Sequence, residues 1–173
     1  MVASSTAGTS GPFTLRDDVI KFPDGPEASY TVLVNPDSAF IVPYFENGDT
    51  MLVRQWRHAW DASSWEVPAG TFNGDEDPLD CAKRELAEET GLLAARYTSL
   101  GVVHGAAFLT GSAHMFLAQS LTQSDRSPEA YEQDMEVLRM PFAEALEAAL
   151  NGTIVHSGSV TALCRAARTL KVL

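Results

Sequence analysis

The chain has 173 residues, a hydrophobic fraction of 45% and a formal net charge of −11 at pH 7. This length suits one folded domain with its own core, and no apolar run approaches the roughly 20 residues of a membrane-spanning helix. The acidic balance argues against a nucleic-acid partner, because such proteins neutralise phosphates with Lys and Arg.

The N-terminal part of the chain is predicted to be rich in strands. Residues 1–12 are dominated by small and polar residues and lack the basic and apolar regions of a secretion signal, so we expect a disordered leader. One domain would then cover residues 13–173. Strands are predicted at 13–21, 30–34, 39–45 and 50–56, with Asn47-Gly48 as a hairpin turn. Residues 57–64 are predicted to be a connection, and 65–69 a brief strand.

A central helix is predicted over residues 78–90. Asp77 is a suitable N-cap, Pro78 suits the first helical position, and Gly91 is a natural terminator. Apolar residues repeat within this segment at helical spacing. The helix can therefore pack one face against a core and present another to solvent.

The C-terminal half adds further strands and two helices. Strands are predicted at 97–103, 114–119 and 136–140, a polar loop at 121–133, and amphipathic helices at 141–150 and 159–170. No internal repeat or domain boundary is visible. Strands flanked by a central and two terminal helices predict a layered domain of the α/β or α+β class.

Acidic residues concentrate between positions 70 and 92, where seven acids face two bases. Glu85, Glu88 and Glu89 follow i, i+3, i+4 spacing, so their carboxylates project from one helical face. Like charges at this distance repel one another unless they are solvated or meet a cation. All-oxygen ligands suit Mg²⁺, with Mn²⁺ as a substitute, and Mg²⁺ is commonly shared with substrate phosphates. The spacing therefore predicts metal-assisted phosphate chemistry.

The same window resembles the signature of the Nudix hydrolase family, G-x5-E-x7-R-E-U-x-E-E-x-G-U with U aliphatic. It is matched by Gly70, Glu76, Arg84, Glu85, Leu86, Glu88, Glu89, Gly91 and Leu92. The resemblance implies an α/β/α sandwich with a mixed sheet and an N-terminal antiparallel strand region. It further implies a homodimer, in which the strands of residues 13–45 take part.

The resemblance also implies roles for single residues. Glu85 and Glu89 would be the main metal ligands, Glu88 would assist, and the backbone carbonyl of Ala69 would be a further ligand. Glu88 and Glu89 count for this reason as catalytic candidates. Arg84 is expected to hold the carboxylate cluster in place rather than to touch substrate.

The general base is assigned by resemblance alone. In similar proteins a glutamate in a mobile loop before the last strand activates water. Glu132 lies at the matching place and is our candidate, with Glu129 and Asp134 as alternatives.

The flanks of the signature indicate the substrate. The runs 53–57 (VRQWR) and 65–70 (WEVPAG) resemble those of ADP-ribose pyrophosphatases and nucleoside diphosphate sugar hydrolases. In similar proteins the arginine at the place of Arg57 contacts the substrate diphosphate, which a bidentate guanidinium suits. Arg54, Trp56 and Glu66 are further substrate-binding candidates. The expected activity is metal-dependent hydrolysis of ADP-ribose or a related nucleoside diphosphate sugar.

Two features keep alternatives open. The loop after the signature lacks a proline that ADP-ribose hydrolases commonly carry, so other nucleoside diphosphate derivatives are possible substrates. A sensor domain that binds a nucleotide sugar with little turnover is the second alternative, against which the intact glutamates argue. Trp56, Trp60 and Trp65 are expected in the core, with stacking on a base as the alternative.

The histidines and cysteines show no spacing typical of a catalytic or metal site. The four histidines are predicted to be surface or satisfied polar residues, and His104 is also a candidate for the substrate site because it lies in the loop after the signature; they are His58, His104, His114 and His156. Cys81 and Cys164 lie far apart without metal-ligand spacing, which favours reduced thiols and a cytoplasmic protein. The expected partner is a small molecule, without a nucleic acid or a membrane.

Overall fold

The computed structural model describes residues 1–126 and 134–172, which fall into two compact units. The first unit consists of Met1–Asp37 and Val103–Ala113, and the second of Ser38–Val102 and His114–Leu173. The prediction of a single domain over residues 13–173 stays a prediction.

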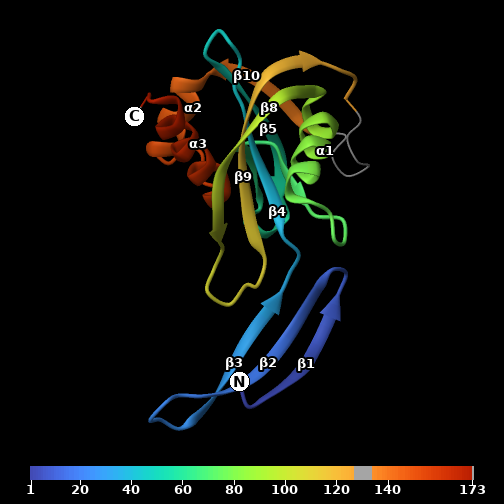
Figure 1. The fold of residues 1–173 in the computed structure, drawn as a ribbon, viewed down its shortest axis with the longest axis vertical. Helices are drawn as coiled ribbons and strands as arrows, with labels where there is room; N and C mark the ends of the chain where they lie inside the picture. Colours follow the sequence, from blue (N-terminus) through green and yellow to red (C-terminus); the bar gives the residue numbers. More distant parts are fainter. Residues whose placement is uncertain (127–133, 173) are drawn as a thin grey trace. The chain divides into compact units, whose positions relative to one another are not determined.

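The first unit is built on an antiparallel sheet of β1 (Ala3–Ser10), β2 (Phe13–Lys21) and β3 (Glu27–Val34), drawn in blue in Figure 1. The strand β1 lies inside the segment expected to be a disordered leader, so that expectation is wrong for these residues. All residues of β1 are exposed, which is why apolar periodicity does not reveal the strand. Its order comes instead from pairing with β2, from Ala3 opposite Val19 to Ser10 opposite Phe13.

The second unit holds two sheets of described strands. One has the order β7-β4-β9-β8, and the other has the order β10-β5-β6. The strand bounds are β4 (Ser38–Pro43), β5 (Asp49–Arg57), β6 (Ala62–Glu66), β7 (Ala69–Thr71), β8 (Leu92–His104), β9 (Ser112–Gln123) and β10 (Glu136–Pro141). Both β8 and β9 are longer than predicted: β8 already begins at Leu92, directly after α1, and β9 extends to Gln123 through mostly polar, partly exposed residues.

Three α-helices cover this unit in the described chain: α1 (Pro78–Thr90), α2 (Phe142–Leu150) and α3 (Ser157–Leu170). In Figure 1 the green α1 lies on one side of the strands and the orange to red α2 and α3 on the other. The layered α/β class predicted from the sequence is therefore confirmed. None of the helices in residues 1–126 and 134–172 is long and apolar enough to cross a membrane.

The helix α1 forms where its capping residues predict. The Asp77 carboxylate accepts a hydrogen bond from the Leu79 N–H at 2.8 Å, and Gly91 ends the helix with a φ of 69°. A Cβ on Gly91 would lie 2.8 Å from the Ser124 carbonyl oxygen, so a side chain is disfavoured by space as well as by conformation. The apolar face of α1 packs against β4 and β9 in a buried cluster that contains Ile41, Leu86, Leu92 and Phe116.

The segment before the acidic window differs from the prediction in a way that matters for the site. The predicted strand at 65–69 is instead two strands: β6 ends at Glu66, and β7 begins at Ala69. The strand β6 pairs with β5, whereas β7 pairs with β4. Pro68 lies between them and has no N–H to offer a strand ladder. The chain therefore changes sheets at Val67-Pro68, which brings the ends of β5, β6 and β7 together.

Candidate active site

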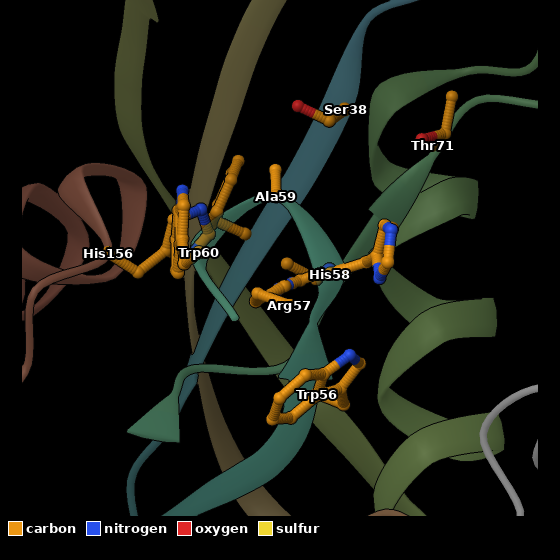
Figure 2. Close-up of a pocket in the computed structure, with 11 residues that line it drawn as sticks. Ser38, Trp56, Arg57, His58, Ala59, Trp60, Thr71 and His156 are labelled. Carbon is orange, nitrogen blue, oxygen red and sulfur yellow. The ribbon is translucent and has the colours of Figure 1, made fainter. Parts of the chain in front are cut away.

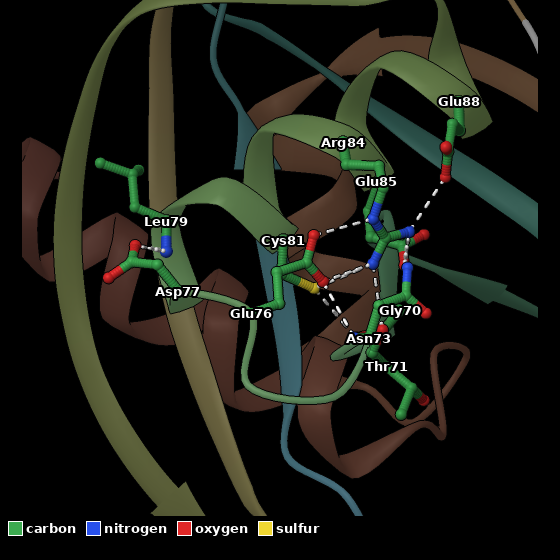
Figure 3. A network of polar contacts seen from close by, with 10 residues as sticks. All are labelled: Gly70, Thr71, Asn73, Glu76, Asp77, Leu79, Cys81, Arg84, Glu85 and Glu88. Atoms are coloured by element: carbon green, nitrogen blue, oxygen red, sulfur yellow. Dashed lines mark hydrogen bonds and ion pairs between the residues drawn. The ribbon is translucent and has the colours of Figure 1, made fainter.

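Arg84 organises the acidic window (Figure 3). Its Nε and Nη2 atoms donate to the two oxygens of Glu76 at 3.0 and 2.9 Å. Its Nη1 atom donates to Glu85 at 2.7 Å and to Glu88 at 3.0 Å. These hydrogen bonds from Arg84 lower the pKa of Glu76 to about 2. One guanidinium thus ties the loop before α1 to two successive turns of the helix.

The lack of a side chain at Gly70 leaves room for the Glu85 carboxylate. A Cβ built on Gly70 would overlap the Glu85 carboxylate, so that carboxylate fills the space a side chain would take. Glu85 is almost fully buried and Glu89 is fully buried. Glu89 Oε2 accepts a hydrogen bond from the Ala69 N–H at 2.9 Å. The two buried acids of α1 therefore lie directly against β7.

The donor atoms fit a hard divalent cation. The carboxylates of α1 and the backbone of Ala69 offer only oxygen ligands, which Mg²⁺, Mn²⁺ and Ca²⁺ prefer. Within residues 1–126 and 134–172, however, no group of three or more His, Cys, Asp and Glu side chains is close enough to form a ready-made metal centre. Arg84 meets two of the acids instead, so a metal ion would have to share Glu85 and Glu88 with this arginine.

A second charged group lies at the ends of β5 and β6. Arg57 donates to the Glu66 carboxylate through Nε at 2.8 Å and through Nη2 at 2.5 Å. The Glu66 side chain is fully buried. Burial raises the pKa of Glu66, but hydrogen bonds from Arg57 and His156 outweigh burial and lower it to about 2. Glu66 therefore fixes the position of the Arg57 guanidinium from a fully buried site.

A cavity of about 460 Å³ joins the arginine to the acidic window. Its walls include Arg57, Trp60, His156, Ala69 and Gly70. Figure 2 shows Trp60 beside His156 near the start of α3, with Arg57 between them and Trp56. The ring centroids of Trp60 and His156 are 5.8 Å apart. The cavity is therefore bordered by a cation, an aromatic wall and the backbone next to the buried acids.

A second cavity of about 420 Å³ shares Trp56 and Arg57 with the first. Its other walls include Arg54, Glu136 and Asp134. Arg54 forms an ion pair with Glu136 at 2.8 Å, and its guanidinium lies over the Trp65 ring at 5.9 Å. Arg54, Trp56 and Arg57 thus line the same second cavity.

The expectation that the tryptophans lie in the core is wrong for two of them. The exposed fractions of Trp56 and Trp60 are 56% and 47%, so neither residue lies in the core. His156 is a satisfied polar residue, as predicted, but its partner is unexpected: its Nδ1 atom lies 2.7 Å from the buried Glu66 carboxylate, so it belongs to the charged group. No local pattern could have revealed this, because His156 is 90 positions from Glu66 in the sequence.

The general-base candidates fall mostly outside the described residues. Glu129 and Glu132 lie in residues 127–133, outside the described parts of the chain. Asp134 is described; it is exposed and lines the second cavity.

The NUDIX domain model matches residues 34–158. The chain belongs to the Nudix family. It is 36% identical over 160 residues to the ADP-ribose pyrophosphatase of Mycobacterium tuberculosis, covering 90% of this chain and 77% of that protein. It is 27% identical over 130 residues to the ADP-ribose pyrophosphatase of Bacillus subtilis, covering 74% of this chain and 70% of that protein.

A solved structure shares the fold. The crystal structure of an ADP compounds hydrolase matches with a TM-score of 0.88 and 21% identity, over 99% of this chain and 93% of that one. The family prediction made from residues 70–92 is confirmed. Nudix hydrolases generally require a divalent metal, in agreement with the all-oxygen donor set of α1.

Proposed function

We propose that this protein hydrolyses the pyrophosphate bond of ADP-ribose or a related nucleoside diphosphate sugar, giving a nucleoside monophosphate and a sugar phosphate. The observation that carries the proposal is the cavity in which Arg57 faces the Ala69–Gly70 edge of the acidic window. The negative charges of a diphosphate can be bound by a guanidinium and by a metal ion. Arg57 and the backbone of Ala69, which would be a metal ligand, line the same cavity. The activity in the names of the two relatives supports the same substrate class.

Each part of the site has a proposed role. Arg57 binds and orients the diphosphate. Glu85, Glu88 and Glu89 together with the Ala69 carbonyl would hold Mg²⁺, for which Mn²⁺ could substitute. Mg²⁺ bound there would supply charge that neutralises phosphate oxygens and makes a bound water more acidic. Within this proposal Arg54 and Trp56 border the half of the substrate that extends from the diphosphate into the second cavity.

Hydrolysis also requires a proton acceptor. The oxygen of water forms a new bond to one phosphorus, the bridging anhydride bond breaks, and the bridging oxygen leaves with the other phosphate. A carboxylate takes the proton of the attacking water. We propose Glu132 for this step, with Glu129 and Asp134 as the alternatives. The variants E132Q, E129Q and D134N separate them, since only the true base should lose turnover while Km changes little.

A substrate panel tests the proposal. Purified protein with Mg²⁺ is offered ADP-ribose and other nucleoside diphosphate sugars, and the products are read by phosphorus NMR. We expect two phosphomonoester signals to replace the diphosphate signals of at least one compound, and E89Q to prevent this. Folded protein that yields no phosphomonoester from any compound would overturn the proposal. Tight binding without turnover would then favour the sensor domain.

Assembly and location are further parts of the proposal. We propose a homodimer in which residues 13–45 take part, and exposed apolar side chains on β2 and β3, such as Phe13, Leu15 and Tyr30, support it. Light scattering on a sizing column should then give twice the chain mass of 18.7 kDa, and the monomer mass would contradict it. The two unpaired cysteines support a reducing, cytoplasmic location.

A further inference from the structure

His156 connects the start of α3 to the arginine at the end of β5. Its Nδ1 atom lies 2.7 Å from Glu66 Oε2, the same oxygen that accepts from Arg57 Nη2. The Nδ1 atom also lies 3.1 Å from the Ser159 hydroxyl oxygen. That hydroxyl is fully buried and accepts a hydrogen bond from the Val67 N–H. The histidine therefore belongs to a continuous chain of contacts that ends at the guanidinium of Arg57.

The position of His156 in the fold argues for a role beyond helix capping. It occupies the N-cap of α3, yet its side chain makes no capping hydrogen bond. The imidazole instead packs against two aromatic rings, with centroid distances of 5.4 Å to Phe40 and 5.8 Å to Trp60. A side chain packed against two rings has little rotational freedom. Its contact with Glu66 is therefore fixed by packing and not only by the hydrogen bond.

The direction of this hydrogen bond follows from its partner. An ionised carboxylate can only accept, so Nδ1 must carry the proton. The low pKa of Glu66 agrees with a carboxylate that stays ionised between Arg57 and His156. With two donors to one buried carboxylate, Glu66 can neither rotate nor move without losing hydrogen bonds. Arg57, which is bound to Glu66 through two nitrogens, is held in the same way.

We infer that His156 is a positioning residue for the diphosphate-binding Arg57 and acts on it through Glu66. This inference rests on the proposed function for its kinetic meaning, but the contacts that it concerns exist without substrate. Through His156, the start of α3 controls where the guanidinium points in the cavity. Positioning residues of this kind are commonly worth 10- to 100-fold, roughly, in affinity or activity.

Two substitutions separate the hydrogen bond from the packing. H156F keeps an aromatic ring next to Phe40 and Trp60 but cannot donate to Glu66. H156N loses the ring, but its amide nitrogen takes the place of Nδ1 and can donate. We expect H156F to raise Km about 10-fold or more with a much smaller change in kcat, because Arg57 binds the diphosphate in both the substrate and the transition state. We expect H156N to keep most of the wild-type Km.

The double variant with R57A tests whether His156 acts through the arginine. In the R57A background, H156F should cause no further loss of kcat/Km, because the group that it positions is absent. An equal loss in both backgrounds would overturn the inference. So would an H156N variant that is folded and as impaired as H156F, because ring packing alone would then explain the effect.

A measurement without substrate separates this inference from the proposed function. The Nε–H proton signal of Arg57, assigned by its loss in R57A, should be retained in H156N and shifted or broadened in H156F. An unchanged signal in H156F would overturn the inference, whatever reaction the protein catalyses. If H156F does not fold, S159A should shift the same signal, while T169A, which removes an exposed hydroxyl from α3, should leave it unchanged.

Discussion

Replacing Glu66 by glutamine should destabilise the protein in a way that depends on pH. The pKa of Glu66 is about 2 in the folded protein against an ordinary value of 4.5. This difference corresponds to about 3 kcal/mol of folding free energy at neutral pH. Because the folded pKa is the lower one, the contribution is fully present above pH 4.5 and is lost as the pH falls through 2. E66Q should therefore be less stable than the wild type by about 3 kcal/mol at pH 7.

The difference in folding stability between the wild type and E66Q should be smaller at acidic pH. With these pKa values, about 1.4 kcal/mol of the contribution is lost between pH 7 and pH 3.5. Urea unfolding of the wild type and E66Q at both pH values measures the gap directly. E136Q is the matched control, because Glu136 forms an exposed ion pair with Arg54 that should be worth less than about 1 kcal/mol. A gap between E66Q and the wild type that is equal at both pH values would refute the reasoning.

Three further outcomes can be checked with simple measurements. E89Q should lower initial rates with Mg²⁺ by at least about 100-fold, because the amide removes one charged ligand, while the unfolding midpoint changes little. Unchanged rates would contradict the metal assignment. Gly70→Ala should displace the Glu85 carboxylate and cost about 1–3 kcal/mol in urea unfolding, and a neutral result would show that Glu85 can move. Burial, the largest cause, raises the pKa of Cys81 to about 12, so mass spectrometry after iodoacetamide at pH 8 should find Cys164 labelled and Cys81 unlabelled; labelled Cys81 would disprove its burial.

The acidic window could be predicted because its information is local. The cap at Asp77, the terminator at Gly91 and the spacing of the glutamates all act within a few turns of one helix. The spacing also accounts for Arg84, which lies one turn before Glu88 and bonds to it at 3.0 Å. The hydrogen bond from Arg84 to Glu76, in the loop before α1, also lies within this short window. Short-range chemistry of this kind is visible in a sequence before any fold is known.

The charged group at the cavity could not be predicted, because it is assembled from distant segments. Arg57 and Glu66 were recognised only as members of flanking motifs, and Glu66 was expected to touch substrate. It is completely buried, and its partner His156 comes from the start of α3. Val67 and Ser159, which are hydrogen-bonded at 3.1 Å, are 92 residues apart. The strand β1 was missed for a related reason, since its order depends on a partner strand rather than on its own composition.

Charge decides how an acidic protein can bind an acidic ligand. With a net charge of −11 the chain repels nucleotides at long range, so the attraction has to be local. Arg84 cannot supply it, because its guanidinium is engaged by Glu76, Glu85 and Glu88. Arg57 lines the cavity with a side chain that is one-third exposed, although Glu66 compensates its charge. A diphosphate therefore needs a second cation at the α1 carboxylates, so substrate affinity should depend on the divalent metal more steeply than on bulk salt.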